Sequence, residues 1–165
     1  MIKLILAVAV VTSATLVGNS FSLKLSNRRK TLESVVKAIS RMKTLICFGS
    51  FDTTRVVEDC LCDNEFPLLD IEDIGNTADF TTTLINAIEN ISPTFSLNKS
   101  DKKLLSEFGS QLGATDVTGQ VAHTELYSQL FTQRLEQAKI QETQKSKLYR
   151  ILGFSLGCAI TLMVI

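Results

Sequence analysis

The stretch QVAHTELYSQLFTQRLEQAKIQETQKSKLYR, residues 120–150, decides the fold class of this chain. Neither Pro nor Gly interrupts it, so nothing in the stretch breaks a helix. Four apolar residues recur along it at steps of four, four and three, namely Tyr127, Phe131, Leu135 and Ala138. These steps keep the apolar side chains on one face of an α-helix. We therefore expect a long helix that begins near Asp116 and runs unbroken into the apolar segment that follows.

That apolar segment reads ILGFSLGCAITLMVI and carries no charge over residues 151–165. Lys145, Lys147 and Arg150 precede it, and basic residues mark the cytoplasmic side of a membrane helix. With Tyr149 as an interfacial aromatic, the segment is short but approaches the length that crosses a bilayer. Residues 149–165 are therefore predicted to be a C-terminal transmembrane helix.

Gly153 and Gly157 form a G-x-x-x-G motif within this segment. Small residues at this spacing allow two membrane helices to approach closely. We expect the two glycines either to pair with another helix, in this chain or in a partner, or merely to be tolerated.

The N-terminus repeats the pattern in mirror image. Residues 4–17 read LILAVAVVTSATLV, and Lys3 is the one charge within residues 1–22. A cleaved signal peptide is the alternative. Because the basic residues follow this segment, the positive-inside rule favours an uncleaved anchor over residues 1–22. The two anchors together place both termini outside the cytoplasm and the middle of the chain inside it.

The middle, residues 23–148, is predicted to be one cytoplasmic helical bundle. No segment alternates with a period of two, as a half-buried strand would. The expected helices cover 25–46, continuing the first anchor, a short segment near 56–61, about 79–91, and a segment capped at Asn98 or Ser100 and stopped by Gly113. The fold class is thus all-α: a single helical bundle domain flanked by N- and C-terminal transmembrane helices.

Charge is balanced overall but unevenly distributed. Between Lys24 and Lys43 there are seven basic residues and one acidic residue, whereas between Asp52 and Glu89 there are ten acidic residues and one basic residue. The basic stretch is typical of contact with anionic lipid headgroups, and without Trp or interleaved aromatics it does not indicate nucleic-acid binding. The acidic stretch is predicted to be a solvated face or a docking surface for a basic partner, with candidates Glu58, Asp59 and Asp63.

The sequence shows no clear arrangement of residues for catalysis or for binding a metal or cofactor. Cys60 and Cys62 lack a second pair and a nearby His, so thiols packed in a core are favoured over a zinc site. His123 is the single His of the chain, and in a polar helix it is expected at the surface. We therefore predict no catalytic, cofactor-binding or metal-binding residue and no small-molecule substrate. The chain is not expected to be an enzyme.

Two motifs give the chain a family resemblance. The stretch FGSQLGATD followed by Gln120 fits the pattern F-G-x-x-L-G-x-x-D-x-x-x-Q, and KLYRILG fits a K-x-Y-R-x-L-G pattern before an apolar tail. The first pattern is carried by Phe108, Gly109, Leu112, Gly113, Asp116 and Gln120. With these motifs the chain resembles stage III sporulation protein AB of endospore-forming bacteria. It departs from the family in the segment GSFDTTRVVEDC, which lacks the usual Pro, and in the acidic stretch after it.

The resemblance implies a role. The family's cytoplasmic domain is similar to that of the type II secretion platform protein F, which couples an ATPase to an envelope assembly. By this analogy, the chain would be a platform subunit of the mother cell–forespore transenvelope channel complex. It would lie in the outer forespore membrane and dock the ATPase-like stage III sporulation protein AA. A platform protein of a general type II secretion or pilus-like assembly is the alternative, although such proteins usually carry two copies of the domain.

Overall fold

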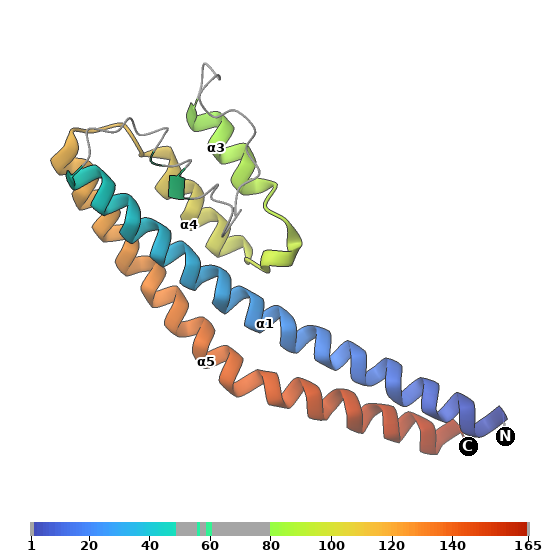
Figure 1. Cartoon of the computed structure of the whole chain (residues 1–165). Coiled ribbons are helices and arrows are strands. Elements are labelled where there is room, and N and C mark those ends of the chain that lie inside the picture. Colours follow the sequence, from blue (N-terminus) through green and yellow to red (C-terminus); the bar gives the residue numbers. More distant parts are fainter. Residues whose placement is uncertain (1, 49–55, 57–58, 61–79, 165) are drawn as a thin grey trace. The chain divides into compact units, whose positions relative to one another are not determined.

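Regular structure in the described part of the chain is entirely helical. The computed structural model describes residues 2–48, 56, 59–60 and 80–164 (Figure 1). The helices are α1 (Ile2–Phe48), α3 (Phe80–Glu89), α4 (Lys99–Ser110) and α5 (Val117–Val164), with a 3-10 turn, η2 (Pro93–Phe95), between α3 and α4. No strand occurs in these residues, which confirms the predicted all-α class.

The two longest helices run through from the apolar termini into the charged middle of the sequence. Helix α1 joins the apolar residues near the N-terminus to the basic segment without a break. Helix α5 does the same from Val117 to Val164. Both continuities follow from the absence of Pro, and they confirm the expected unbroken helices. Of the short helix expected near 56–61, Val56, Asp59 and Cys60 are described, and all three are helical.

The chain forms two compact units. The first combines Met1–Arg29 with Gln137–Ile165, and the second is Lys30–Glu136. The predicted membrane boundaries at residues 22 and 149 fall inside the first unit. Each unit is described separately below.

The second unit buries one apolar stripe from each of its helices. Within the helix expected over 25–46, α1 buries the apolar residues Leu32, Val35, Ile39 and Met42, each with 0% exposure. The other helices and the segments beside them contribute Leu84, Ile88, Ile91, Leu105, Phe108, Leu112, Tyr127, Phe131 and Leu135. The spacing of these residues follows the period of 3.6 on which the sequence prediction rested.

Polar contacts fix the shorter elements of the second unit. Asn98 caps α4: its side chain accepts from the Asp101 amide at 2.7 Å, and the Asp101 carboxylate accepts from the Asn98 amide at 3.3 Å. This reciprocal capping box selects Asn98 over Ser100 as the start of the helix. Lys102 Nζ donates to the carbonyl oxygens of Glu89 and Ile91 and so satisfies groups at the end of α3.

One described helix is long and apolar enough to cross a membrane. It is the part of α1 from Val8 to Phe48, and 11% of its most apolar window is buried. This apolar, mostly exposed helix near the N-terminus suggests association with a membrane. Among the described residues, the C-terminal part of α5 does not meet the same test of length and apolar composition. The second membrane span therefore stays a prediction.

Candidate functional site

The first unit brings glycines of α1 and α5 into backbone contact. A Cβ atom added to Gly18 would lie 2.6 Å from the Tyr149 carbonyl oxygen, and one added to Gly153 would lie 2.9 Å from the Ala14 carbonyl oxygen. The opposing atoms are backbone atoms, which cannot rotate away as a side chain can. Gly18 and Gly153 therefore permit a helix separation that no other residue pair would allow.

Gly157 extends this contact one turn further along α5. A Cβ atom added there would lie 3.0 Å from the Val11 Cα and 3.1 Å from the Ala14 Cβ. Both glycines of the G-x-x-x-G motif thus face α1 of the same chain, and both are buried.

A layer of hydroxyl groups follows the glycines along the helix pair. The Ser22 side chain is 1% exposed, and its Oγ lies 2.5 Å from the Ser146 Oγ. Arg150 Nε donates to the Ser22 Oγ at 3.2 Å. Ser22 therefore links two residues of α5, and the layer satisfies polar groups that would be costly to bury alone.

Two charged contacts continue the pairing of α1 with α5. Arg28 is 8% exposed and donates through Nη1 to the Gln141 Oε1 at 2.9 Å. Arg29 Nε lies 2.7 Å from the Glu142 Oε2. These partly buried contacts fix the register of the two helices where their residues become charged.

In the second unit, two polar residues of the sequence motif fix the turn between α4 and α5. The Asp116 Oδ1 accepts from the Gly119 amide at 3.0 Å, which caps the N-terminus of α5. Gln120 is 5% exposed, and its Nε2 donates to the Gln111 carbonyl oxygen and the Thr115 Oγ1. The Gln120 Oε1 is buried without a described partner. Asp116 and Gln120 thus act within the turn.

The apolar residues of the same motif pack the helices around this turn. Gly109 lies against α3, because a Cβ atom there would meet the Leu84 Cδ2 at 2.8 Å. Phe108 and Leu112 are buried. Gly113 has a φ of 80°, which glycine adopts readily, but α4 ends earlier, at Ser110. Gly113 therefore shapes the turn after the helix and does not itself stop the helix.

His123 joins the two helices of the turn. Its ring stacks on Phe108 at 5.2 Å and tilts against Tyr127 at 4.7 Å. Its Nε2 lies 3.0 Å from the Phe108 carbonyl oxygen near the end of α4. The expected surface position is therefore wrong: His123 is half-buried, because residues on a neighbouring helix surround it. Burial raises the pKa of Tyr127, and the negative charge of Glu107 adds to this effect.

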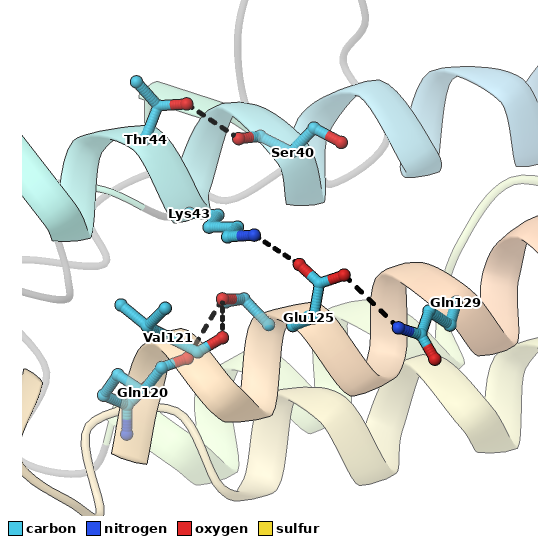
Figure 2. Close-up of polar contacts among 8 residues, drawn as sticks. Ser40, Lys43, Thr44, Gln120, Val121, Glu125 and Gln129 are labelled. Carbon is cyan, nitrogen blue, oxygen red and sulfur yellow. Dashed lines mark hydrogen bonds and ion pairs between the residues drawn. The ribbon is translucent and has the colours of Figure 1, made fainter. Parts of the chain in front are cut away.

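An exposed ion pair ties α1 to α5 within the second unit. Lys43 Nζ of α1 contacts the Glu125 carboxylate of α5, which also accepts from the Gln129 side chain (Figure 2). The hydrogen bond from Lys43 lowers the pKa of Glu125, and the same contact raises the pKa of Lys43. The pair is accessible to solvent, so it serves pairing specificity more than stability.

Of the three predicted docking residues, the structure describes only Asp59. Asp59 is exposed and lies beside the buried Cys60, whereas Glu58 and Asp63 fall outside the described residues. Cys62 also falls outside them. Among the residues that the structure describes, no group of His, Cys, Asp and Glu is arranged to hold a metal ion.

Comparison with known proteins assigns the family. The sequence profile of stage III sporulation protein AB (spore_III_AB) matches residues 3–165, nearly the whole chain. The chain belongs to the stage III sporulation protein AB family. This membership gives it a role in stage III of sporulation and confirms the resemblance found in the motifs. No curated protein and no solved structure matches the chain significantly.

As a member of the stage III sporulation protein AB family, the chain shows where its motif residues act. The motif residues gather at one turn: Phe108, Gly109 and Leu112 pack, Gly113 has a positive φ, and Asp116 and Gln120 form hydrogen bonds. The residues of α1 that contact the glycines and Ser146 of α5 were not identified from the sequence. The signal was present, because Ala14, Gly18 and Ser22 recur every four residues and so share one face of α1.

Proposed function

We propose that the chain is a non-catalytic membrane platform subunit of the mother cell–forespore transenvelope channel complex, and that it docks an ATPase subunit. The observation that carries the proposal is the apolar helix pair of the first unit, whose two helices each continue into a packed helical domain. Family membership supplies the sporulation context. The chemistry of the second unit supplies the reason to favour a scaffold over an enzyme.

The contacts within the first unit support a hairpin with both termini on one side. Gly157 contacts Val11, Gly153 contacts Gly18, and Ser146 contacts Ser22. As residue numbers rise along α1 they fall along α5, so the two segments are antiparallel. Basic residues flank the apolar runs on the side of the charged middle, and by the positive-inside rule this supports a cytoplasmic middle.

The same contacts support an uncleaved anchor. Removal of residues 1–22 as a signal peptide would take away Ala14 and Gly18, the residues that Gly153 and Gly157 contact. The small-residue face of α5 would then lack its partner in the same chain. A retained hairpin accounts for the small residues of both helices.

Buried polar groups in the second unit serve the fold. Asp101 is 0% exposed and forms the capping box of α4. Thr31 donates to the Phe95 carbonyl oxygen at 2.9 Å, which holds the turn before α4 against α1. His123 contacts the end of α4. Buried polar groups whose hydrogen bonds stabilise the fold are typical of a scaffold, which supports a platform role.

We place the ATPase-docking surface at Glu58, Asp59 and Asp63. The region is acidic, and Asp59 is exposed beside the buried Cys60. A charged residue next to a buried anchor is held at the surface of the domain, where complementary charge can steer a basic partner. The ATPase-like stage III sporulation protein AA is the partner that the family analogy suggests.

A capture experiment tests the docking. The full chain in detergent, immobilised on resin, should retain purified stage III sporulation protein AA. The variant Glu58→Lys, Asp59→Lys, Asp63→Lys should retain at least about tenfold less, because like charges would then face the partner. The matched control Glu89→Lys, Glu107→Lys, Glu136→Lys reverses the same number of charges elsewhere and should bind as the wild type does.

Two results would count against the proposal. Unchanged capture by the first variant would remove these three residues as the dock, and no capture by the wild-type chain would remove the docking role. The sporulation role has its own test, because deletion of the gene should arrest development after engulfment. A normal spore yield from a clean deletion would contradict the proposed place in the channel complex.

A further inference from the structure

The paired helices of the first unit carry an excess of positive charge beside their apolar runs. Residues 22–29 and 137–150 contain seven basic residues and one acidic residue, whereas residues 8–21 and 151–163 contain none of either. The single carboxylate, Glu142, already pairs with Arg29, and Arg28 is buried against Gln141. These contacts engage two of the seven cations, and the unit keeps an excess of positive charge beside its apolar runs.

Four of these basic residues form what we call the basic collar: Lys24, Lys145, Lys147 and Arg150. All four are exposed, and among the described residues no carboxylate forms a salt bridge with them. They come from both helices, since Lys24 lies on α1 and the others lie on α5. The collar immediately adjoins the uncharged runs of both helices.

Aromatic and hydroxyl groups position two residues of the collar, Lys24 and Arg150. Lys24 Nζ lies 5.5 Å from the centre of the Phe21 ring, and that ring lies 5.7 Å from the ring of Tyr149. Arg150 is anchored by its hydrogen bond to the buried Ser22. Lys24 thus lies next to a pair of aromatic rings, an arrangement typical of a membrane–water interface.

We propose that the basic collar binds the phosphate groups of anionic phospholipids in the cytoplasmic leaflet and so prefers phosphatidylglycerol over zwitterionic lipid. The proposal rests on the membrane hairpin proposed above and names the lipid class that the hairpin selects. The occupant follows from charge complementarity, because the collar is cationic and uncompensated where the helices become apolar. Each Lys or Arg close to an anionic membrane surface strengthens the attraction roughly fivefold.

Native mass spectrometry of the full chain in a neutral detergent tests this preference. The wild-type chain should retain phosphatidylglycerol at least about tenfold more tightly than phosphatidylcholine. The variant Lys24→Gln, Lys145→Gln, Lys147→Gln should lose most of that preference, because three positive charges are removed. The control Lys37→Gln, Lys99→Gln, Lys103→Gln removes three exposed lysines of the second unit and should keep it.

Two further measurements distinguish a failure of lipid binding from a failure of membrane insertion. An excess of inorganic phosphate should not displace the lipid, since the ligand is a headgroup held in place by its acyl chains. Equal retention of the two lipids by the wild type, or an unchanged preference in the collar variant, would overturn the collar. Extraction of membranes with alkaline carbonate reports insertion independently. A chain that is released by carbonate would overturn the hairpin itself, whereas a chain that is inserted without lipid preference would overturn the collar alone.

Discussion

At the scale of single residues, glycine positions explain much of the family motif. Gly109 faces Leu84 so closely that a side chain on it would have to displace that leucine. Gly113 adopts a positive φ in the turn after α4. These two glycines serve packing and turn geometry, and Asp116 and Gln120 complete the same turn through hydrogen bonds. The motif therefore marks a structural joint between α4 and α5.

Gly109→Val should destabilise the second unit by about 1–3 kcal/mol, because the added atoms overpack the contact between α3 and α4. Ser110→Val is the matched control, since Ser110 is exposed on the next position of the same helix. Thermal unfolding followed by circular dichroism would measure both variants. Equal melting temperatures for the two variants would show that Leu84 can yield, and that Gly109 is not required for packing.

Residue-scale features were only partly predictable from the sequence. The stripe from Leu32 to Met42 was predictable, because burial on one face of a helix repeats with the helical period. The half-buried position of His123 was not, since its neighbour Phe108 lies across a turn on another helix. The sequence also left open whether Gly153 would pair within the chain or with a partner, because both choices need the same small residues.

At the scale of elements, α1 and α5 are joined differently in the two units. In the first unit the joint consists of backbone contact at the glycines, a hydroxyl layer and partly buried charges. In the second unit, apolar side chains are buried and an exposed ion pair lies beside them. The first kind of joint suits lipid, where close packing replaces the hydrophobic effect, and the second suits water.

The glycine contact predicts an intramolecular disulfide. In a chain whose native cysteines are replaced by serine, Ala14→Cys with Gly157→Cys should oxidise readily, because a Cβ atom at Gly157 would lie 3.1 Å from the Ala14 Cβ. Non-reducing electrophoresis should show a monomer of altered mobility. The pair Leu16→Cys with Leu156→Cys, both exposed, should remain reduced within the chain. A covalent dimer formed by the first pair would instead indicate pairing between chains.

The ion pair between α1 and α5 predicts a pH dependence of stability. Lys43 lowers the folded-state pKa of Glu125, so the contribution of the ionised carboxylate is present above about pH 4.3 and is lost as pH falls through the lower folded value. The raised pKa of Lys43 makes its contribution full below about pH 10.4 and lost as pH rises through the higher folded value.

The melting temperature of Glu125→Gln should therefore lie furthest below that of the wild type between about pH 4.3 and about pH 10.4. The difference should disappear in acid, where Glu125 is protonated, and in strong base, where Lys43 is deprotonated. Because both side chains are exposed, the gap should be small and should shrink in about 1 M salt. Circular dichroism melts across the pH range would measure it. A gap that is constant with pH would show that the two charges do not interact in solution.

At the scale of the whole molecule, the proposed topology places Cys47 in the cytoplasm. Cys47 is exposed near the end of α1, so its thiol is accessible once reagent reaches it. With the other cysteines replaced by serine, a membrane-impermeant maleimide should label Cys47 in lysed spheroplasts and not in intact ones. Ile2→Cys in a cysteine-free chain should be labelled in intact spheroplasts. The reverse labelling pattern would invert the topology.

The hydroxyl layer and the glycine contact also limit how the hairpin can transmit force. If α5 slid along α1 by one helical turn, about 5.4 Å, Ser146 would leave Ser22 and Glu142 would leave Arg29. A slide in one direction would also drive the Tyr149 side chain towards Gly18, where no side chain fits. Sliding between the two helices is therefore opposed by the loss of these polar contacts, and in one direction also by a steric clash. Under the proposed ATPase docking, the two helices of the first unit would then move together.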